Sequence, residues 1–202
     1  YNVDARDISV GSIGGIVGAV TTGYVEDCRT WGLFWAYPES YWNGDTQKIV
    51  NSSRIHHIGG IVGNIAVGQE KTGGLVRYCE NHLQIDATRD TLGVGYSIGG
   101  IVGGIGGYAK VRECVNHASV TAGEDVGGIV GVVSPGEGKN ASLAYVENRG
   151  SIQMTSSSTS VGAGGIIGTA GGTKSIGGST QYVGDVWLEH AYNSGKVTAG
   201  KQ

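Results

Sequence analysis

The sequence predicts an all-β protein in which short strands repeat along one axis. A hexapeptide containing a Gly-Gly pair occurs five times in 202 residues, as Ile13–Gly18, Ile58–Gly63, Ile98–Gly103, Val126–Gly131 and Ala163–Gly168. Ordered recurrence of this kind indicates stacked structural repeats. Gly accounts for 39 residues, whereas Pro accounts for 2 and charged residues for 15%. Val, Ile, Thr and Ser are abundant, which is typical of short strands joined by tight turns.

A second motif lies between the copies of the hexapeptide. Aligned copies show one column of small or apolar residues, which holds Cys28, Cys79, Cys114, Val146 and Ala191. A column two residues later holds Thr30, Asn81, Asn116, Asn148 and Asn193. These columns alternate with polar ones, so they predict the inward face of an extended strand. An apolar residue three positions before the Cys column breaks the alternation, and we expect a bend between the two.

The shortest spacing between hexapeptides, 28 residues, defines the basic repeat. A unit of this size cannot bury its apolar side alone, and stacking as a right-handed parallel β-helix of about five coils solves the problem. The Gly-Gly pair would mark a corner that needs positive φ or a close approach of the backbone. The inward Asn side chains would form a ladder at a coil corner. The alternative is a β-sandwich, but hairpin signals are scarce.

Residues 1–202 are interpreted as a single repeat domain and as a fragment of a longer array. Lys196–Gly200 repeats Ser119–Gly123, which directly precedes the fourth hexapeptide. The repeats begin near residues 13, 58, 98, 126 and 163, and loops are inserted at 86–97 and 169–185.

A further insertion at 31–57 is rich in aromatic residues. It carries the candidate contact residues Trp31, Trp35, Tyr37, Tyr41 and Trp42. Aromatic side chains grouped on one loop can stack on sugar rings or anchor a protein partner. Alternatively, they fold back over the first coils as a local cap.

The Cys column is predicted to hold structural thiols, because Val and Ala occupy the same column in other repeats and a buried Cys behaves as a small apolar residue. His82 and His117 lie three residues after Cys79 and Cys114, on the opposite face of the strand. Thiol and imidazole therefore diverge, no metal site is predicted, and the two His are expected to stack on the surface. No cofactor is predicted, although the loop acids Glu124 and Asp125 leave structural calcium open.

Neither a hydrolytic triad nor an H-E-x-x-H motif can be assembled, so no catalytic residues are predicted and the protein is expected to be non-enzymatic. The net charge of -3 offers no basic stripe for nucleic acid. No apolar run approaches the roughly 18–20 residues of a membrane span, so none is expected in this segment.

The paired motifs resemble the GLUG repeat of bacterial surface proteins. Gly127–Gly131 matches the first half of that repeat, G-G-L-V-G, and His190–Val197 matches its second half, N-S-Y-A-T-G-x-V. The resemblance covers all five units, with departures at Thr30, in the long insertions and in Ile or Val for Leu. The family includes segments of adhesins and of immunoglobulin-A-cleaving metallopeptidases, in which the repeats are not catalytic.

This resemblance implies an extracellular or cell-surface location on a bacterium and a role in adhesion, display or spacing. Its partners would be a host glycan or protein, or other domains of the same parent chain. Two alternatives stay open. One is a carbohydrate-active β-helix enzyme or a carbohydrate-binding module, and the other is the non-catalytic repeat region of a secreted metallopeptidase. Two or more acids with a Lys or Arg within about 10 Å on one exposed face would favour the enzyme.

Overall fold

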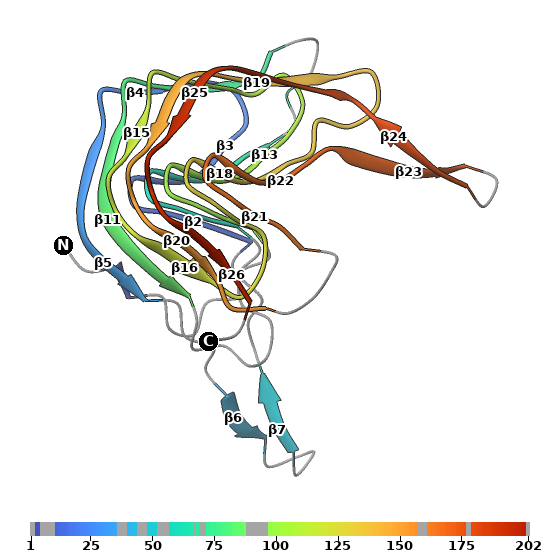
Figure 1. Ribbon diagram of the computed structural model, residues 1–202. Helices are drawn as coiled ribbons and strands as arrows, with labels where there is room; N and C mark the ends of the chain where they lie inside the picture. The colour runs from blue at the N-terminus through green and yellow to red at the C-terminus, as the bar shows by residue number, and fades with distance from the viewer. Residues whose placement is uncertain are drawn as a thin grey trace.

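The protein is a stack of parallel β-coils (Figure 1). The structure is a computed structural model that describes residues 3–4, 11–35, 40–43, 48–51, 57–66, 68, 72–87, 97–156, 161–176 and 179–200. The strands of these residues form three stacks of parallel strands and two antiparallel hairpins, and no described residue is in a helix. The predicted all-β parallel β-helix is confirmed and the β-sandwich alternative is wrong. The right-handed winding stays a prediction.

The five hexapeptides form two short parallel sheets, because each copy has one strand that ends at the Gly-Gly pair and one that begins after it. The first strands are β2 (Ser12–Gly14), β8 (His57–Gly59), β12 (Ser97–Gly99), β17 (Val126–Gly127) and β21 (Ala163–Gly164). The second strands are β3 (Val17–Val20), β9 (Val62–Ile65), β13 (Val102–Ile105), β18 (Val130–Val133) and β22 (Ile167–Ala170). Pairing stacks residues 13, 58, 98, 126 and 163 one above another.

The second motif forms the largest sheet, the curved outer wall in Figure 1. The strands that begin each turn of this wall are β4 (Gly23–Glu26), β10 (Gly74–Arg77), β14 (Lys110–Arg112), β19 (Asn140–Asn148) and β25 (Asp185–Asn193). The wall continues in β5 (Arg29–Trp35), β11 (Glu80–Ala87), β15 (Val115–Asn116), β16 (Val120–Ala122), β20 (Ile152–Met154) and β26 (Val197–Ala199). The short strand β1 (Val3–Asp4) pairs with β5.

The predicted bend before the Cys column is a stack of residues in the left-handed region. In each coil the residue directly before this column has positive φ: Asp27 (54°), Tyr78 (56°), Glu113 (52°), Tyr145 (56°) and His190 (48°). This conformation costs an L-residue roughly 1–2 kcal/mol. It turns the chain so that two residues three positions apart, such as Val76 and Cys79, both face the interior, where both are fully buried.

The inward Asn side chains form a continuous hydrogen-bonded ladder. The Nδ2 atoms of Asn81, Asn116 and Asn148 each donate to the Oδ1 of the next Asn at 2.8 Å, and the Thr30 hydroxyl donates to Asn81 Oδ1 at 2.7 Å. Each Nδ2 also donates to the carbonyl two residues on, such as Leu83 O at 3.1 Å. Asn81 lies within β11, whereas Asn116, Asn148 and Asn193 are the last residues of β15, β19 and β25. The ladder is confirmed, and its place at a coil corner stays a prediction.

The Gly-Gly pairs lie opposite this ladder and are required by close contact. A Cβ on Gly60 would lie 2.4 Å from Asn81 Cγ, and one on Gly100 would lie 2.4 Å from Asn116 Cγ. A Cβ on Gly59 would lie 1.9 Å from Val62 O. None of the glycines in the five pairs has a positive φ. Close backbone approach is therefore the reason for Gly-Gly, and the positive-φ alternative is wrong.

The Asn–Gly contact divides the interior of each coil into two hydrophobic clusters. One cluster contains the Cys column and apolar residues from the second hexapeptide strands, including Cys79, Cys114 and Val102. The other contains Leu83, Ile85 and the apolar residues of the first hexapeptide strands. Cys79, Asn81 and Leu83 are each two residues apart along one extended segment, so all three face the interior. One segment therefore supplies both clusters and the polar ladder between them.

The Cys column lies inside the coil, as its sequence pattern predicts. Cys79 and Cys114 are fully buried, Cys28 is half-buried, and all three are free thiols. Each thiol donates to the carbonyl two residues earlier in the same coil, as Cys114 Sγ does to Arg112 O at 3.1 Å. Hydrogen bonding with Cys79 and burial both raise the pKa of Cys114. These properties fit a structural role.

The insertions lie outside the stacked coils, and the aromatic one begins later than its sequence pattern suggests. Strand β5 continues to Trp35 in register with β11, which places Phe34 beside Ile85 in the core. The insertion then contributes the hairpin β6 (Ser40–Asn43) and β7 (Lys48–Asn51). The loop after β11 lies largely outside the described residues. The insertion near residue 169 forms the hairpin β23 (Gly172–Ile176) and β24 (Ser179–Val183) (Figure 1).

We predict that Gly100→Ala strongly destabilises the fold. Its Cβ would meet Gly128 O at 2.2 Å as well as the Asn116 amide, and neither backbone nor ladder can move without disturbing the neighbouring coils. We expect a loss of at least about 2 kcal/mol in the free energy of unfolding, measured by urea denaturation. Gly123→Ala is the matched control, because nothing lies within 4 Å of its Cβ position, and it should change stability by under about 0.5 kcal/mol. Equal effects of the two substitutions would contradict the close-contact account.

We predict that Cys79 and Cys114 resist a thiol-specific reagent in the native protein. Both side chains are fully buried, so labelling requires unfolding of the stack. Mass spectrometry after labelling in buffer should show the half-buried Cys28 as the main site, and labelling in denaturant should show all three. Rapid modification of Cys114 in the native protein would contradict the inward register.

Candidate functional site

The outward face of the first three coils carries a stack of rings. The register pairs His82 with Trp31 and sets His117 beside His82 on the next coil. The ring centroids of His82 and His117 are 4.3 Å apart with an interplanar angle of 6°, and those of Trp31 and His82 are 5.4 Å apart at 9°. The two His therefore stack as the sequence pattern predicts, and Trp31 extends the stack.

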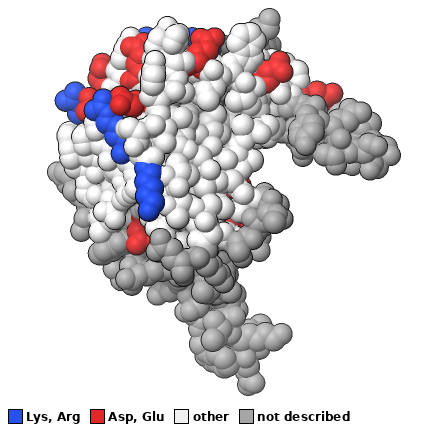
Figure 2. Space-filling view, in the orientation of Figure 1, with Lys and Arg blue, Asp and Glu red and all other residues white. Residues whose placement is uncertain are grey.

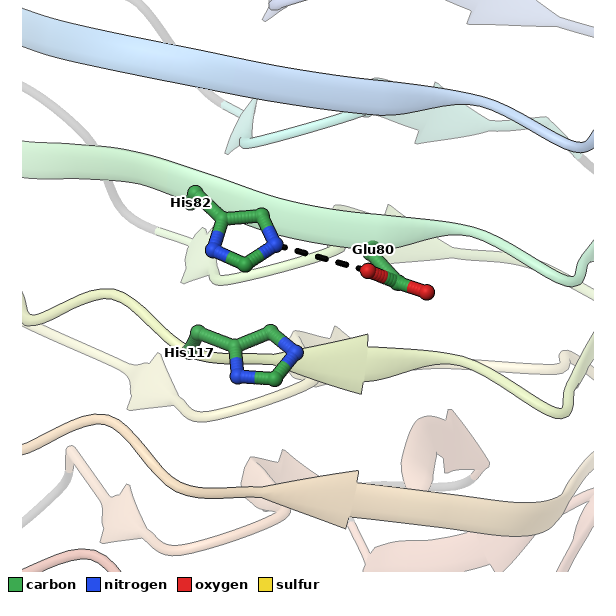
Figure 3. Close-up of side chains that lie close together, drawn as sticks. All are labelled: Glu80, His82 and His117. Atoms are coloured by element: carbon green, nitrogen blue, oxygen red, sulfur yellow. Dashed lines mark hydrogen bonds and ion pairs between the residues drawn. The ribbon is translucent and has the colours of Figure 1, made fainter.

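Glu80 joins the two His on this face. It lies two residues before His82 in β11, so both side chains project from the same side of the strand. Glu80 Oε2 lies 3.4 Å from His82 Nε2 (Figure 3). Glu80 Oε1 accepts a hydrogen bond from Arg29 Nη2 at 3.1 Å. The hydrogen bond from His82 and the nearby Arg29 lower the pKa of Glu80. Burial and the neighbouring His82 and Arg149 lower the pKa of His117.

These three residues bring potential metal ligands together. The nearest ligand atoms of Glu80, His82 and His117 all lie within 4.8 Å of one another, and within the described part of the chain no other group of three or more His, Cys, Asp or Glu does so. The buried thiols take no part, because Cys79 and Cys114 face the interior. Of the loop acids considered for calcium, Asp125 uses Oδ1 to accept hydrogen bonds from Thr169 Oγ1 at 2.6 Å and from the Gly162 amide at 2.9 Å.

A groove of about 690 Å³ crosses the outer wall at the fourth coil. Register explains why it exists. The outward column that holds Lys110 and Trp187 holds the small Ser142 between them, and the column that holds Arg112 and Glu189 holds Ala144 between them. Short side chains on β19 thus leave a trough between the longer side chains of β14 and β25, two strand spacings or about 9.6 Å apart.

The groove combines aromatic surface with charge of both signs. Trp187 is 56% exposed, and the Tyr108 ring, which also lines the groove, lies 5.8 Å from Lys139 Nζ. Asp185 and Glu189 contribute carboxylates. An apolar ring surface flanked by hydrogen-bonding groups suits a ligand that has an apolar face and polar edges.

The two carboxylates of the groove project from the same side of one strand. Asp185 and Glu189 are four residues apart in the extended strand β25, which separates their Cα atoms by about 13 Å. Glycosidases generally hold their two carboxyl groups about 5–9.5 Å apart. Each side chain extends several ångströms from its Cα, so this backbone spacing does not exclude hydrolysis. The two acids lie with Lys110 and Arg112 on one face, which keeps the carbohydrate-active enzyme open as an alternative.

Of the predicted aromatic contact residues, Trp31 has a described side chain, and it is not among the described residues that line this groove. Trp31 lies in β5, is 57% exposed and stacks on His82. The backbones of Trp35, Tyr41 and Trp42 lie in β5 and β6, and Tyr37 lies outside the described residues. The proposal that they contact a ligand stays a prediction.

Sequence reasoning missed both the groove and the Glu80–His82–His117 group. The aligned columns already held the second signal, since Glu80, His82 and His117 occupy outward columns on neighbouring coils. The groove was harder to find, because it depends on two small residues, Ser142 and Ala144, that are ordinary in sequence. Their significance appears only when coils three to five are placed in register.

Charges on the face shown in Figure 2 gather along one edge and leave much of the surface without acid or base. Three ion pairs join side chains of the outer wall: Arg77–Glu26, Arg29–Glu80 and Arg149–Glu147. The Arg149 and Glu147 side chains form a bidentate pair with both N···O distances at 2.7 Å. Because water screens exposed charges, such pairs contribute little to stability.

The chain matches no protein-family model, no curated protein and no solved structure. Among the described residues there is no helix with the length and apolar character needed to cross a membrane.

Proposed function

We propose that this chain is a non-enzymatic solenoid segment of a secreted or cell-surface bacterial protein and acts in adhesion, display or spacing. The observation that carries the proposal is the groove between Tyr108 and Trp187, which is built on a rigid stack. The Asn ladder links all five coils in register, so residues on neighbouring coils keep fixed relative positions. A surface held in this way is suited to presenting a contact site.

We infer that the ligand of the groove is a glycan. Sugar rings present an apolar C–H face that stacks on Trp187 or Tyr108 and hydroxyl groups that hydrogen-bond to charged side chains. Lys110, Arg112 and Glu189 flank the trough and supply donors and acceptors along its length. This favours a carbohydrate ligand among the alternatives, and the carbohydrate-active enzyme stays the second candidate because Asp185 and Glu189 line the same groove as Lys110 and Arg112. A place in a secreted metallopeptidase would be compatible with the same binding role.

A glycan array with the purified chain tests the binding proposal. Trp187→Ala should reduce binding by at least about 10-fold, because it removes the exposed stacking surface at the groove. Trp31→Ala is the matched control, since Trp31 is 57% exposed against 56% for Trp187 but lies outside the groove. Ser142→Tyr fills the trough while leaving Trp187 in place, and it should abolish binding.

Two results would contradict this assignment. Loss of glycan binding in Trp31→Ala with retention in Trp187→Ala would move the contact surface to the aromatic segment. Release of new reducing ends from a bound polysaccharide would show that the chain is an enzyme. Circular dichroism of each variant should match the unmodified protein, because all three substituted side chains lie on the outer face.

A further inference from the structure

We propose that Glu80, His82 and His117 form a binding site for a divalent transition-metal ion of the zinc class. Two imidazoles and one carboxylate are a ligand set that holds Zn²⁺ in proteins and leaves a fourth position open. The three side chains come from two neighbouring coils, β11 and the β15 coil that follows it, and all face outward (Figure 3).

The distances are close to those that one ion requires. Metal–ligand bonds of about 2.0–2.2 Å place two ligands of a tetrahedral ion roughly 3.3 Å apart. Glu80 Oε2 and His82 Nε2 already lie 3.4 Å apart, and the whole group lies within 4.8 Å. Side-chain movements of about 1 Å would bring all three ligand atoms to this spacing, and they require tilting the stacked imidazoles. All three side chains are partly exposed, so solvent and ions reach them.

The backbone preorganises this group. The His117 amide donates to Asn81 O at 2.8 Å, the Glu80 amide to Cys28 O at 2.9 Å and the Val115 amide to Cys79 O at 3.0 Å. The Asn ladder on the opposite face of the same strands fixes the register that brings the two His together. Sites built on paired strands hold their ligands more firmly than sites on loops.

The surrounding charges leave the imidazoles available. The Arg149 guanidinium is already paired with Glu147. Arg29 competes for Glu80, and in the metal-bound state it can keep one carboxylate oxygen while the other coordinates the ion. Trp31 stacks on the ring face of His82 that points away from His117 and limits the rotation of the imidazole.

Titration with ZnCl₂ by isothermal calorimetry in a non-chelating buffer tests the proposal. One ion should bind per chain with a dissociation constant in the micromolar range. His82→Gln and His117→Gln should each weaken binding by at least about 30-fold, and Glu80→Gln by about 10-fold, since each removes one ligand. Addition of CoCl₂ should give the visible absorption of four-coordinate Co²⁺ without a sulfur-to-cobalt charge-transfer band.

Two control variants test whether the loss of Zn²⁺ binding is specific to the three proposed ligands. His190→Asn removes another outward imidazole, which stacks on Tyr145, and Asn tolerates the positive φ at this position. Asp27→Asn removes an exposed carboxylate that lies outside the group, and Asn again tolerates the positive φ of the position. Both should bind Zn²⁺ within about threefold of the unmodified protein.

The proposal is overturned if the unmodified chain binds no Zn²⁺ when the ion is in roughly 100-fold excess over the protein. Even weak surface sites begin to fill at an excess on this order. It is also overturned if binding survives in the double variant His82→Gln/His117→Gln, or if a sulfur-to-cobalt band shows that the thiols are the ligands. Circular dichroism verifies that each variant is folded, so unfolding cannot be mistaken for the loss of a metal ligand.

Discussion

The contact between the Asn ladder and the Gly-Gly column is the constraint on which the rest of the coil depends. In four of the five coils the second glycine of the pair sits directly against the Asn amide of the same coil, and any side chain there would overlap it. In the first coil Gly15 faces Thr30 instead. Asn in turn satisfies both donors and its acceptor inside the stack, as Asn81 does with Asn116, Leu83 and Thr30. A buried amide without those partners would cost about 1–3 kcal/mol. The two motifs of the repeat therefore require each other.

Much of this fold could be predicted from the sequence because the repeats act as an internal alignment. Columns such as Cys79/Cys114 and Asn81/Asn116 reveal which residues face inward, and the break in alternation at Val76 reveals the bend. The sequence could not show that Asn and Gly-Gly meet across the interior, because they are about 20 residues apart. Phe34 was assigned to the insertion for a related reason, since its core partner Ile85 lies in the next coil.

The outward face was less predictable, and it is where the binding proposals arise. Outward columns tolerate many residue types, so Trp31, His82 and His117 do not form a recognisable motif along the chain. Stacking at the strand spacing turns such columns into stripes of neighbouring side chains. One stripe brings together two imidazoles and a carboxylate, and another places small residues between large ones and opens a groove. The interior residues thus hold the coils together. The proposed binding sites arise where the outward side chains differ from one coil to the next.

Exchange of the Asn side-chain amide protons, followed by NMR in ²H₂O, tests the central role of the ladder most directly. The Asn116 amide donates to both Ala118 O and Asn148 Oδ1 inside the stack, whereas Asn140 is exposed at the start of β19. The account predicts that the Asn81, Asn116 and Asn148 side-chain protons exchange as slowly as the backbone amides of the surrounding strands, while those of Asn140 exchange at once. Rapid exchange of the Asn116 side chain in the folded protein would contradict it.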